Sequence, residues 1–164
     1  MAGKNRHLYG DIKPILVQIP GAVACSAGDL MFLNTAVSNQ AYPFDALIGG
    51  VSTGTWHENI LHVNFLGVSM EDSKSGVTEN ITIATDGVFR FPVYGGPSAV
   101  TIGSKVSAVS SSLYASGADH VSNEESYSVS GSTAILGICV KTQSGASYVD
   151  FRIIPAKSTG VTLV

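Results

Sequence analysis

Residues 64–70 read NFLGVSM and residues 134–140 read AILGICV, so two segments of one chain have Leu-Gly at the centre between apolar neighbours. A glycine within a β-strand marks a bulge or a close backbone approach, and small sheets bend at such points. The two segments therefore predict matching corner strands in one closed β-domain, with Gly67 and Gly137 at the corners. The alternative is that Leu-Gly between β-branched residues recurs by chance in a glycine-rich β-protein.

The similarity extends to the residues that precede and follow these segments. Gly28 precedes a predicted strand at residues 30–33, and Gly103 precedes one at residues 105–109. A glycine at this place supplies the positive φ of a tight turn.

Each of the two similar parts of the chain is then expected to end in a strand that carries a Phe-Arg or Arg-Phe pair and a proline, at residues 89–92 and at residues 151–155. The loop at residues 94–97 is too short for a domain linker. It is expected to divide one domain into two similar halves.

Period-two alternation is the clearest secondary-structure signal, because Gly, Ser, Thr and β-branched residues interrupt every window long enough for a helix. Residues 81–85 and 88–91 alternate, and Asp86-Gly87 between them predicts a hairpin turn, with Gly87 at its tight point. Further strands are predicted at residues 30–33, 60–70, 105–109, 134–141 and 148–154, and the last turn at residues 143–146. The chain is therefore expected to be all-β: a small closed antiparallel β-barrel or sandwich built from two similar halves, with an extended N-terminal arm.

Composition limits the classes of function. The chain has 164 residues, enough for one core, and 45% of them are hydrophobic while only 13% are charged. A net charge of −3 argues against direct nucleic-acid binding. No apolar run is long enough for a membrane-spanning helix, and the start of the chain has no secretory pattern, so a soluble, unprocessed protein is expected. Cys25 and Cys139 are expected to be reduced, buried, small hydrophobic residues.

Two regions lie outside the repeat, and both are expected to make contacts. Residues 1–20 are predicted to form an extended arm that contains one strand, at residues 15–19. Residues 21–164 are predicted to form a single β-domain with an inserted, aromatic-rich loop at about residues 34–59. The candidate contact residues of the two regions are Arg6, Leu8, Tyr9, Ile12, Ile15, Val17, Tyr42, Phe44 and Trp56.

The residue patterns predict no catalytic, cofactor-binding or metal site. His57 and His62 lack further ligands at suitable spacing, and Asp119-His120 lacks a nucleophile elbow, which favours a solvated loop. Glu71-Asp72 and Glu124-Glu125 are adjacent pairs, whose members point to opposite faces of a strand, so neither pair forms a shared carboxylate site by itself.

The order of the glycine-centred motifs points to one family. The motifs are Gly28-Asp29, Leu66-Gly67-Val68, Thr85 to Phe89 with Pro92, Ile102-Gly103 with Leu113-Tyr114, Leu136-Gly137-Ile138 and Val149 to Ile153. Across roughly residues 20–155, their order and spacing resemble the small β-domain of the capsid cement, or head decoration, proteins of tailed bacteriophages. The chain departs from the family pattern in its N-terminal arm and in the insertion at residues 34–59.

This resemblance implies a non-enzymatic virion protein that is made in the host cytoplasm and attaches to the outer surface of the expanded capsid. Its partners would be the major capsid protein and itself, as a homotrimer or alternatively a dimer, with no direct nucleic-acid or membrane contact. The run at residues 15–19 would add a strand to a sheet edge of a shell protein or of a sister subunit. An alternative function is a carbohydrate- or receptor-binding β-module of a virion tail or fibre, because Trp56, Tyr42 and Phe44 suit stacking on sugars as well as anchoring in a protein interface.

Overall fold

The computed structural model describes residues 6–34, 40–44, 46, 64–92, 98–109, 122–125, 135–146 and 148–154. The predicted insertion at residues 34–59 therefore lies largely outside the described residues, as do residues 60–63, 94–97, 113–114, 119–120 and 155. The strands are β1 (Arg6–Tyr9), β2 (Pro14–Ile19), β3 (Leu30–Leu33), β4 (Ala41–Pro43), β5 (Phe65–Ser69), β6 (Glu79–Ala84), β7 (Val88–Pro92), β8 (Ser98–Val100), β9 (Lys105–Val109), β10 (Ser122–Glu125), β11 (Gly137–Cys139), β12 (Gln143–Ala146) and β13 (Tyr148–Ile153).

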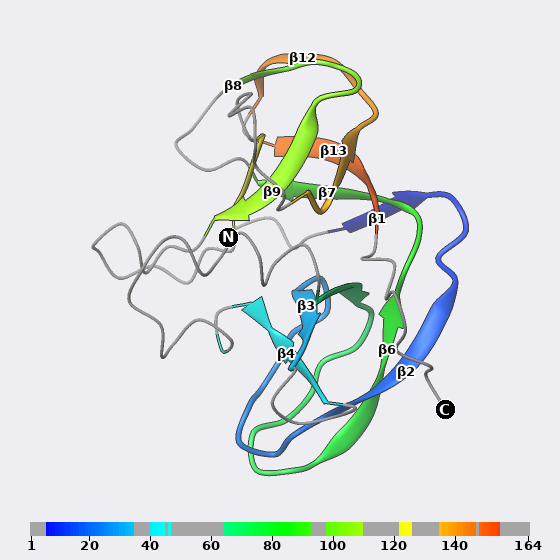
Figure 1. The fold of residues 1–164 in the computed structure, drawn as a ribbon, viewed down its shortest axis with the longest axis vertical. Helices are drawn as coiled ribbons and strands as arrows, with labels where there is room; N and C mark the ends of the chain where they lie inside the picture. Colours follow the sequence, from blue (N-terminus) through cyan, green and yellow to red (C-terminus); the bar gives the residue numbers. More distant parts are fainter. Residues whose placement is uncertain are drawn as a thin grey trace.

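These strands form two large antiparallel sheets, one in each half of the view in Figure 1. The five-stranded sheet has the order β2-β6-β5-β3-β4, and the six-stranded sheet has the order β1-β7-β13-β11-β9-β10. Strands β8 and β12 form a separate two-stranded ribbon. The predicted all-β, antiparallel fold is confirmed, and of the two forms left open it is the sandwich, because no strand ladder closes either sheet on itself among the residues described.

The two sheets repeat one topology. If β1, β8 and β12 are set aside, each sheet has five strands in the spatial order first, fifth, fourth, second, third along its part of the chain. Equivalent backbone hydrogen bonds support this match: the Gly28 N–H donates to Ser69 O over 2.7 Å, and the Gly103 N–H donates to Cys139 O over 2.9 Å. The similarity read from the Leu-Gly segments is therefore a structural duplication.

The predicted boundary between the halves is wrong, and so is the predicted hairpin at Asp86-Gly87. Strand β6 pairs with β2 and β5, whereas β7 pairs with β1 and β13. The chain crosses from one sheet to the other at Asp86-Gly87, because the N–H groups of Thr85 and Asp86 donate to Ile12 O instead of closing a turn. The strand equivalent to β13 is therefore β6, and residues 89–92 are equivalent to β2 and not to residues 151–155.

Two other predicted boundaries also change. Residues 143–146 are a strand, β12, which pairs with β8, and so they are not the last turn. The strand predicted at residues 134–141 is shorter in the structure, where β11 spans Gly137–Cys139.

Gly67 and Gly137 occupy equivalent places in their sheets. Gly67 pairs with Met31 of β3 beside a register shift, and Gly137 pairs with Val106 of β9. A Cβ atom on Gly67 would overlap the backbone carbonyl of Ala84 in the neighbouring strand, and one on Gly137 would overlap the backbone of β13. Strands approach too closely at both points for any side chain. The glycines at turns and at the crossing have positive φ: +99° at Gly28, +115° at Gly87 and +87° at Gly103.

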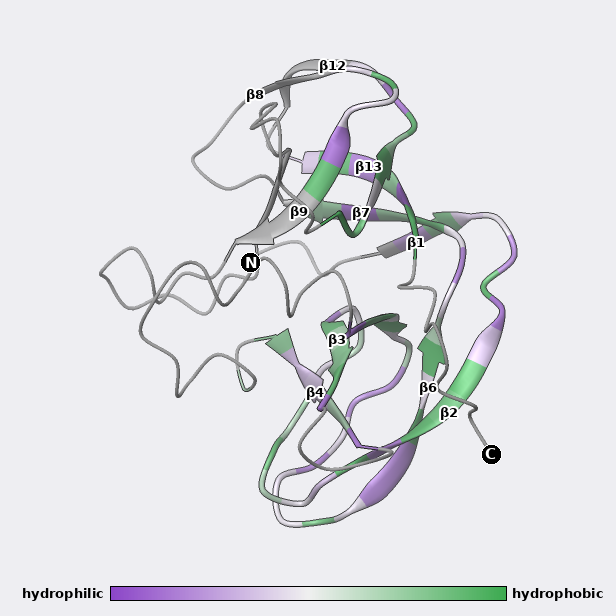
Figure 2. Ribbon diagram, in the orientation of Figure 1, coloured by the Kyte–Doolittle hydropathy of each residue, from purple (hydrophilic) through white to green (hydrophobic). Residues whose placement is uncertain are grey.

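Two apolar clusters form the core. The larger one contains residues of both sheets, including Leu30 and Phe65 of the five-stranded sheet and Phe89 and Phe151 of the six-stranded sheet. The smaller one lies on the opposite face of the five-stranded sheet. The apolar clusters thus cover both faces of the five-stranded sheet and one face of the six-stranded sheet. Figure 2 agrees, since β3 is hydrophobic along its length and both β9 and β13 carry hydrophilic stretches.

Cys25 and Cys139 are both buried and form no disulfide with each other, which confirms the prediction made for them. Cys139 belongs to the larger cluster and Cys25 to the smaller one, so the two thiols pack in different parts of the core.

Candidate interaction surface

The N-terminal segment contributes one strand to each sheet. Strand β1 pairs with β7 at the edge of the six-stranded sheet, and β2 pairs with β6 over six residue pairs from Pro14 to Ile19. The predicted boundary near residue 20 therefore does not separate an arm from the domain. Residues 6–19 are held by main-chain pairing that no sequence pattern at this end of the chain specifies.

The candidate contact residues of this segment differ in accessibility. Tyr9 is 57% exposed, whereas Leu8 is half-buried. Ile12 and Ile15 are half-buried and pack against the two core clusters. Arg6 pairs with Arg90 across the β1–β7 ladder.

Val17 is buried, so its assignment as a contact residue is corrected. Successive residues of β2 point to opposite faces, and Leu16 is the one that points outward, with 73% of its surface exposed. The sequence analysis missed Leu16, although the alternation within residues 15–19 would have identified it.

Of the three aromatic residues predicted as contacts at residues 42–56, Phe44 is corrected. Phe44 is only 1% exposed and packs against Phe32, with the ring centroids 5.4 Å apart. Tyr42 is half-buried, and its hydroxyl donates to Gln40 Oε1 over 3.5 Å. Trp56 lies outside the described residues. Phe44 is therefore a core residue and is not available for stacking on a sugar.

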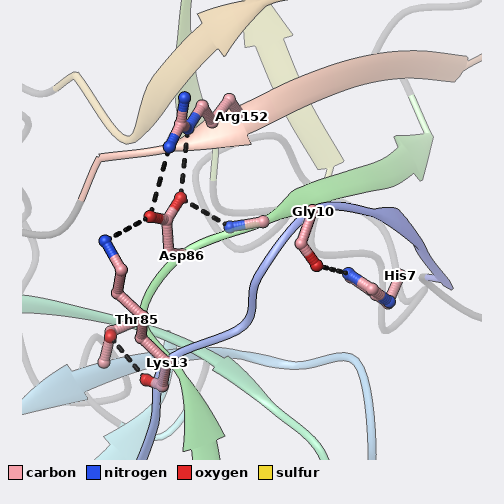
Figure 3. A network of polar contacts seen from close by, with 7 residues as sticks. His7, Gly10, Lys13, Thr85, Asp86 and Arg152 are labelled. Carbon is pink, nitrogen blue, oxygen red and sulfur yellow. Dashed lines mark hydrogen bonds and ion pairs between the residues drawn. The ribbon is translucent and has the colours of Figure 1, made fainter.

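Asp86 joins three segments at the crossing between the sheets (Figure 3). Its carboxylate lies 2.9 Å from Lys13 Nζ and accepts two hydrogen bonds from the Arg152 guanidinium, over 3.1 and 3.2 Å. It also accepts the Gly87 N–H over 2.8 Å. These donors, the Arg152 guanidinium first among them, hold the pKa of Asp86 well below its ordinary value. Because Lys13 precedes β2 and Arg152 lies in β13, one carboxylate ties the two sheets together.

Asp86 makes the stability of the domain depend on pH. A carboxyl group with a lowered folded-state pKa adds stability above its unfolded pKa of about 4, and this stability is lost as the pH falls below that value. We expect Asp86→Asn to cost about 1 kcal/mol at pH 7, a modest value because both cationic partners are well exposed and screened by solvent. Urea melts of the wild type and the variant at pH 7 and pH 3 test this. If the difference in unfolding free energy between the two proteins were the same at both pH values, the predicted pH dependence would be wrong.

The outer face of the six-stranded sheet, which points away from the core shared by the sheets, has a second ion pair. Arg90 donates from Nε and Nη2 to the two carboxylate oxygens of Asp150, over 2.7 and 2.9 Å. Its guanidinium also lies 4.0 Å from the centre of the Tyr148 ring. The hydrogen bonds from Arg90 to Asp150 raise the pKa of Arg90 further. Asp150 is only 3% exposed, so Arg90 neutralises a buried carboxylate at the surface of the sheet.

Acidic side chains gather at the turns of the five-stranded sheet. Asp72 Oδ1 accepts the Ala27 N–H over 2.7 Å, and Asp29 Oδ2 accepts the Ser26 N–H over 2.7 Å. Burial raises the pKa of Asp29, and the nearby charge of Asp72 raises it further. The exposed Lys74 lies in the same region of the chain. These carboxylates cap turns.

Within the residues that the structure describes, no group of three or more His, Cys, Asp or Glu side chains is arranged to hold a metal ion. The same residues include no helix long and apolar enough to cross a membrane.

No family model and no curated protein matches the chain. Among solved structures, it is similar to the head fiber gp8.5 N base of bacteriophage phi29, with a TM-score of 0.44 and 10% sequence identity. The similarity covers 88% of this chain and 97% of that one. At this identity and score the likeness is too distant to assign a function.

Proposed function

We propose that this chain is a non-enzymatic structural protein of a phage virion, which binds the outer surface of the capsid and stabilises the contacts between capsomers. The observation that carries the proposal is the order of the glycine-centred motifs. This order resembles that of the capsid cement family. The two Leu-Gly segments of the chain occupy equivalent positions in the two duplicated sheets. The proposed partners are the major capsid protein and other copies of this chain, in a trimer or a dimer.

The structure suits a mechanical role in physical terms. Two sheets that share one apolar core and are cross-linked at Asp86 form a single body, so a load applied to one sheet is transmitted to the other. A cement protein needs such a body, together with several modest contacts that act at high effective concentration once the first has formed.

The test is to mix the purified full chain with expanded heads, lacking this protein, of the phage that encodes it. We expect the chain to co-sediment with the heads at saturable stoichiometry and to raise the temperature at which they break open. Unexpanded heads serve as the control. Heads that gain neither bound protein nor thermal resistance would overturn the proposal.

The docking strand expected at residues 15–19 cannot be tested by deletion. Deletion of residues 1–18 removes β1 and most of β2, so it would disrupt both sheets and would not isolate attachment. Point substitutions on exposed side chains are the appropriate probe, because they leave the ladders intact.

A further inference from the structure

The duplication allows the same position to be compared in two sheets. In the five-stranded sheet, Leu30, Val68 and Ala84 form one row across three neighbouring strands, and all three are fully buried in the core shared by the sheets. In the first half of the chain, the side chains at this position therefore pack against another layer of protein.

The equivalent row of the six-stranded sheet faces outward. Its members are Lys105 of β9, Ile138 of β11 and Arg152 of β13, which pair with one another in register. Lys105 is exposed, Ile138 is 38% exposed, and the Arg152 side chain is 61% exposed. The row that is internal in one half is therefore at the surface in the other, and no described element covers it.

The row continues across two more strands. Arg152 pairs with Val88 of β7, and Val88 pairs with the exposed Tyr9 of β1. The row thus runs from Lys105 through Ile138, Arg152 and the buried Val88 to a tyrosine at the sheet edge. Tyr and Arg are enriched where protein interfaces derive most of their binding energy.

The outer face differs in charge from the rest of the chain. Among the residues whose side chains the structure describes, register places three cationic residues on it: Arg90, Lys105 and Arg152. Two carboxylates pair with these cations: Asp150, which is buried beneath Arg90, and Asp86, which accepts two hydrogen bonds from Arg152. Three cations against two carboxylates leave an excess of one positive charge, that of Lys105, on the described part of this face, although the chain as a whole has a net charge of −3.

We infer that this outer face is a docking surface for an acidic protein surface, with a carboxylate of the partner placed against Lys105 and an apolar group against Ile138. This inference rests on the proposed function, in which the partner is the exterior of the head shell. Complementary charge speeds encounter and fixes orientation, and the attraction weakens as salt is added. In the first half of the chain, a layer of protein covers the equivalent row.

The experiment compares two lysine reversals. Lys105→Glu changes the charge of the outer face, whereas Lys74→Glu makes the same chemical change at an exposed lysine among the acidic turns of the other sheet. Attachment of each full-length variant to expanded heads is measured at about 0.05 M and about 0.3 M NaCl. We expect Lys105→Glu to weaken attachment at least about tenfold at low salt, with a smaller loss at high salt, and Lys74→Glu to change it less than about twofold.

A second variant tests the apolar centre. Ile138→Asp introduces a carboxylate between Lys105 and Arg152, so the folded domain should tolerate it while docking is lost. Circular dichroism melts show whether each variant folds.

The outcomes separate the two claims. No attachment of the wild type overturns the proposed function and this inference together. If the wild type attaches normally and both lysine variants attach equally well, only the inference about the outer face is overturned. Binding of duplex DNA that Lys105→Glu abolishes would identify nucleic acid as the occupant and would also overturn the inference.

Discussion

Gly137→Ala is expected to destabilise the domain by more than about 3 kcal/mol, the range of severe overpacking. A methyl group at this position would overlap the backbone carbonyl of Arg152 and the ring of Phe151. The carbonyl belongs to a paired central strand, so it cannot move without breaking the β11–β13 ladder. Chemical denaturation followed by tryptophan fluorescence or circular dichroism measures the loss.

Gly67→Ala should have an effect of similar size, because its methyl group would overlap the Ala84 carbonyl at the equivalent point of the other sheet. The matched control is Gly76→Ala. Gly76 has φ +93°, but a Cβ there meets no heavy atom within 4 Å. Its substitution therefore reports backbone strain alone, which costs about 1–2 kcal/mol. If all three variants lost the same stability, the close approach of strands would not be the reason for glycine at the two corners.

Sequence reasoning succeeded where the signal is local. The strands predicted at residues 30–33 and 105–109 are β3 and β9, with the predicted bounds. The Leu-Gly segments identified the duplication, because a close strand approach excludes every residue except glycine at one defined position. Each of these features depends on the residues at the site itself.

Sequence reasoning failed where pairing is set by distant residues. Asp86-Gly87 has the composition of a hairpin turn, but Ile12 accepts the N–H groups on one side of it and Arg152 binds the carboxylate. A local pattern contains no information on these partners, which are more than sixty residues away in one direction or the other. Phe44 was misread for the same reason, since its neighbour Phe32 belongs to another strand.

The outer face was missed because its residues are spread over five strands. Asp150 alternates with buried apolar neighbours in β13, so its outward direction is predictable, whereas its pairing with Arg90 depends on the β7–β13 register. The comparison of buried and exposed rows needs the equivalence of the two sheets, and that equivalence becomes known only when β6 is matched to β13.

Arg90→Leu is expected to cost about 3–5 kcal/mol, the usual range when one partner of a buried ion pair is removed. Loss of the Arg90 guanidinium leaves the Asp150 carboxylate without two hydrogen bonds and without a neutralising charge. The Asp150 side chain is only 4% exposed. Solvent cannot replace these contacts, whereas the Arg90 side chain is 35% exposed and can be hydrated when its partner is absent.

The two single substitutions should therefore be unequal. Asp150→Asn keeps the shape and one acceptor and leaves a cation that water reaches, so we expect it to cost about 1–2 kcal/mol. The double variant Arg90→Leu/Asp150→Leu removes both charges, and it should recover much of what Arg90→Leu alone loses, because no buried charge remains. Urea denaturation of the four proteins gives the coupling energy directly. Equal costs for the two single variants, or losses that simply add in the double variant, would show that the buried carboxylate does not depend on Arg90.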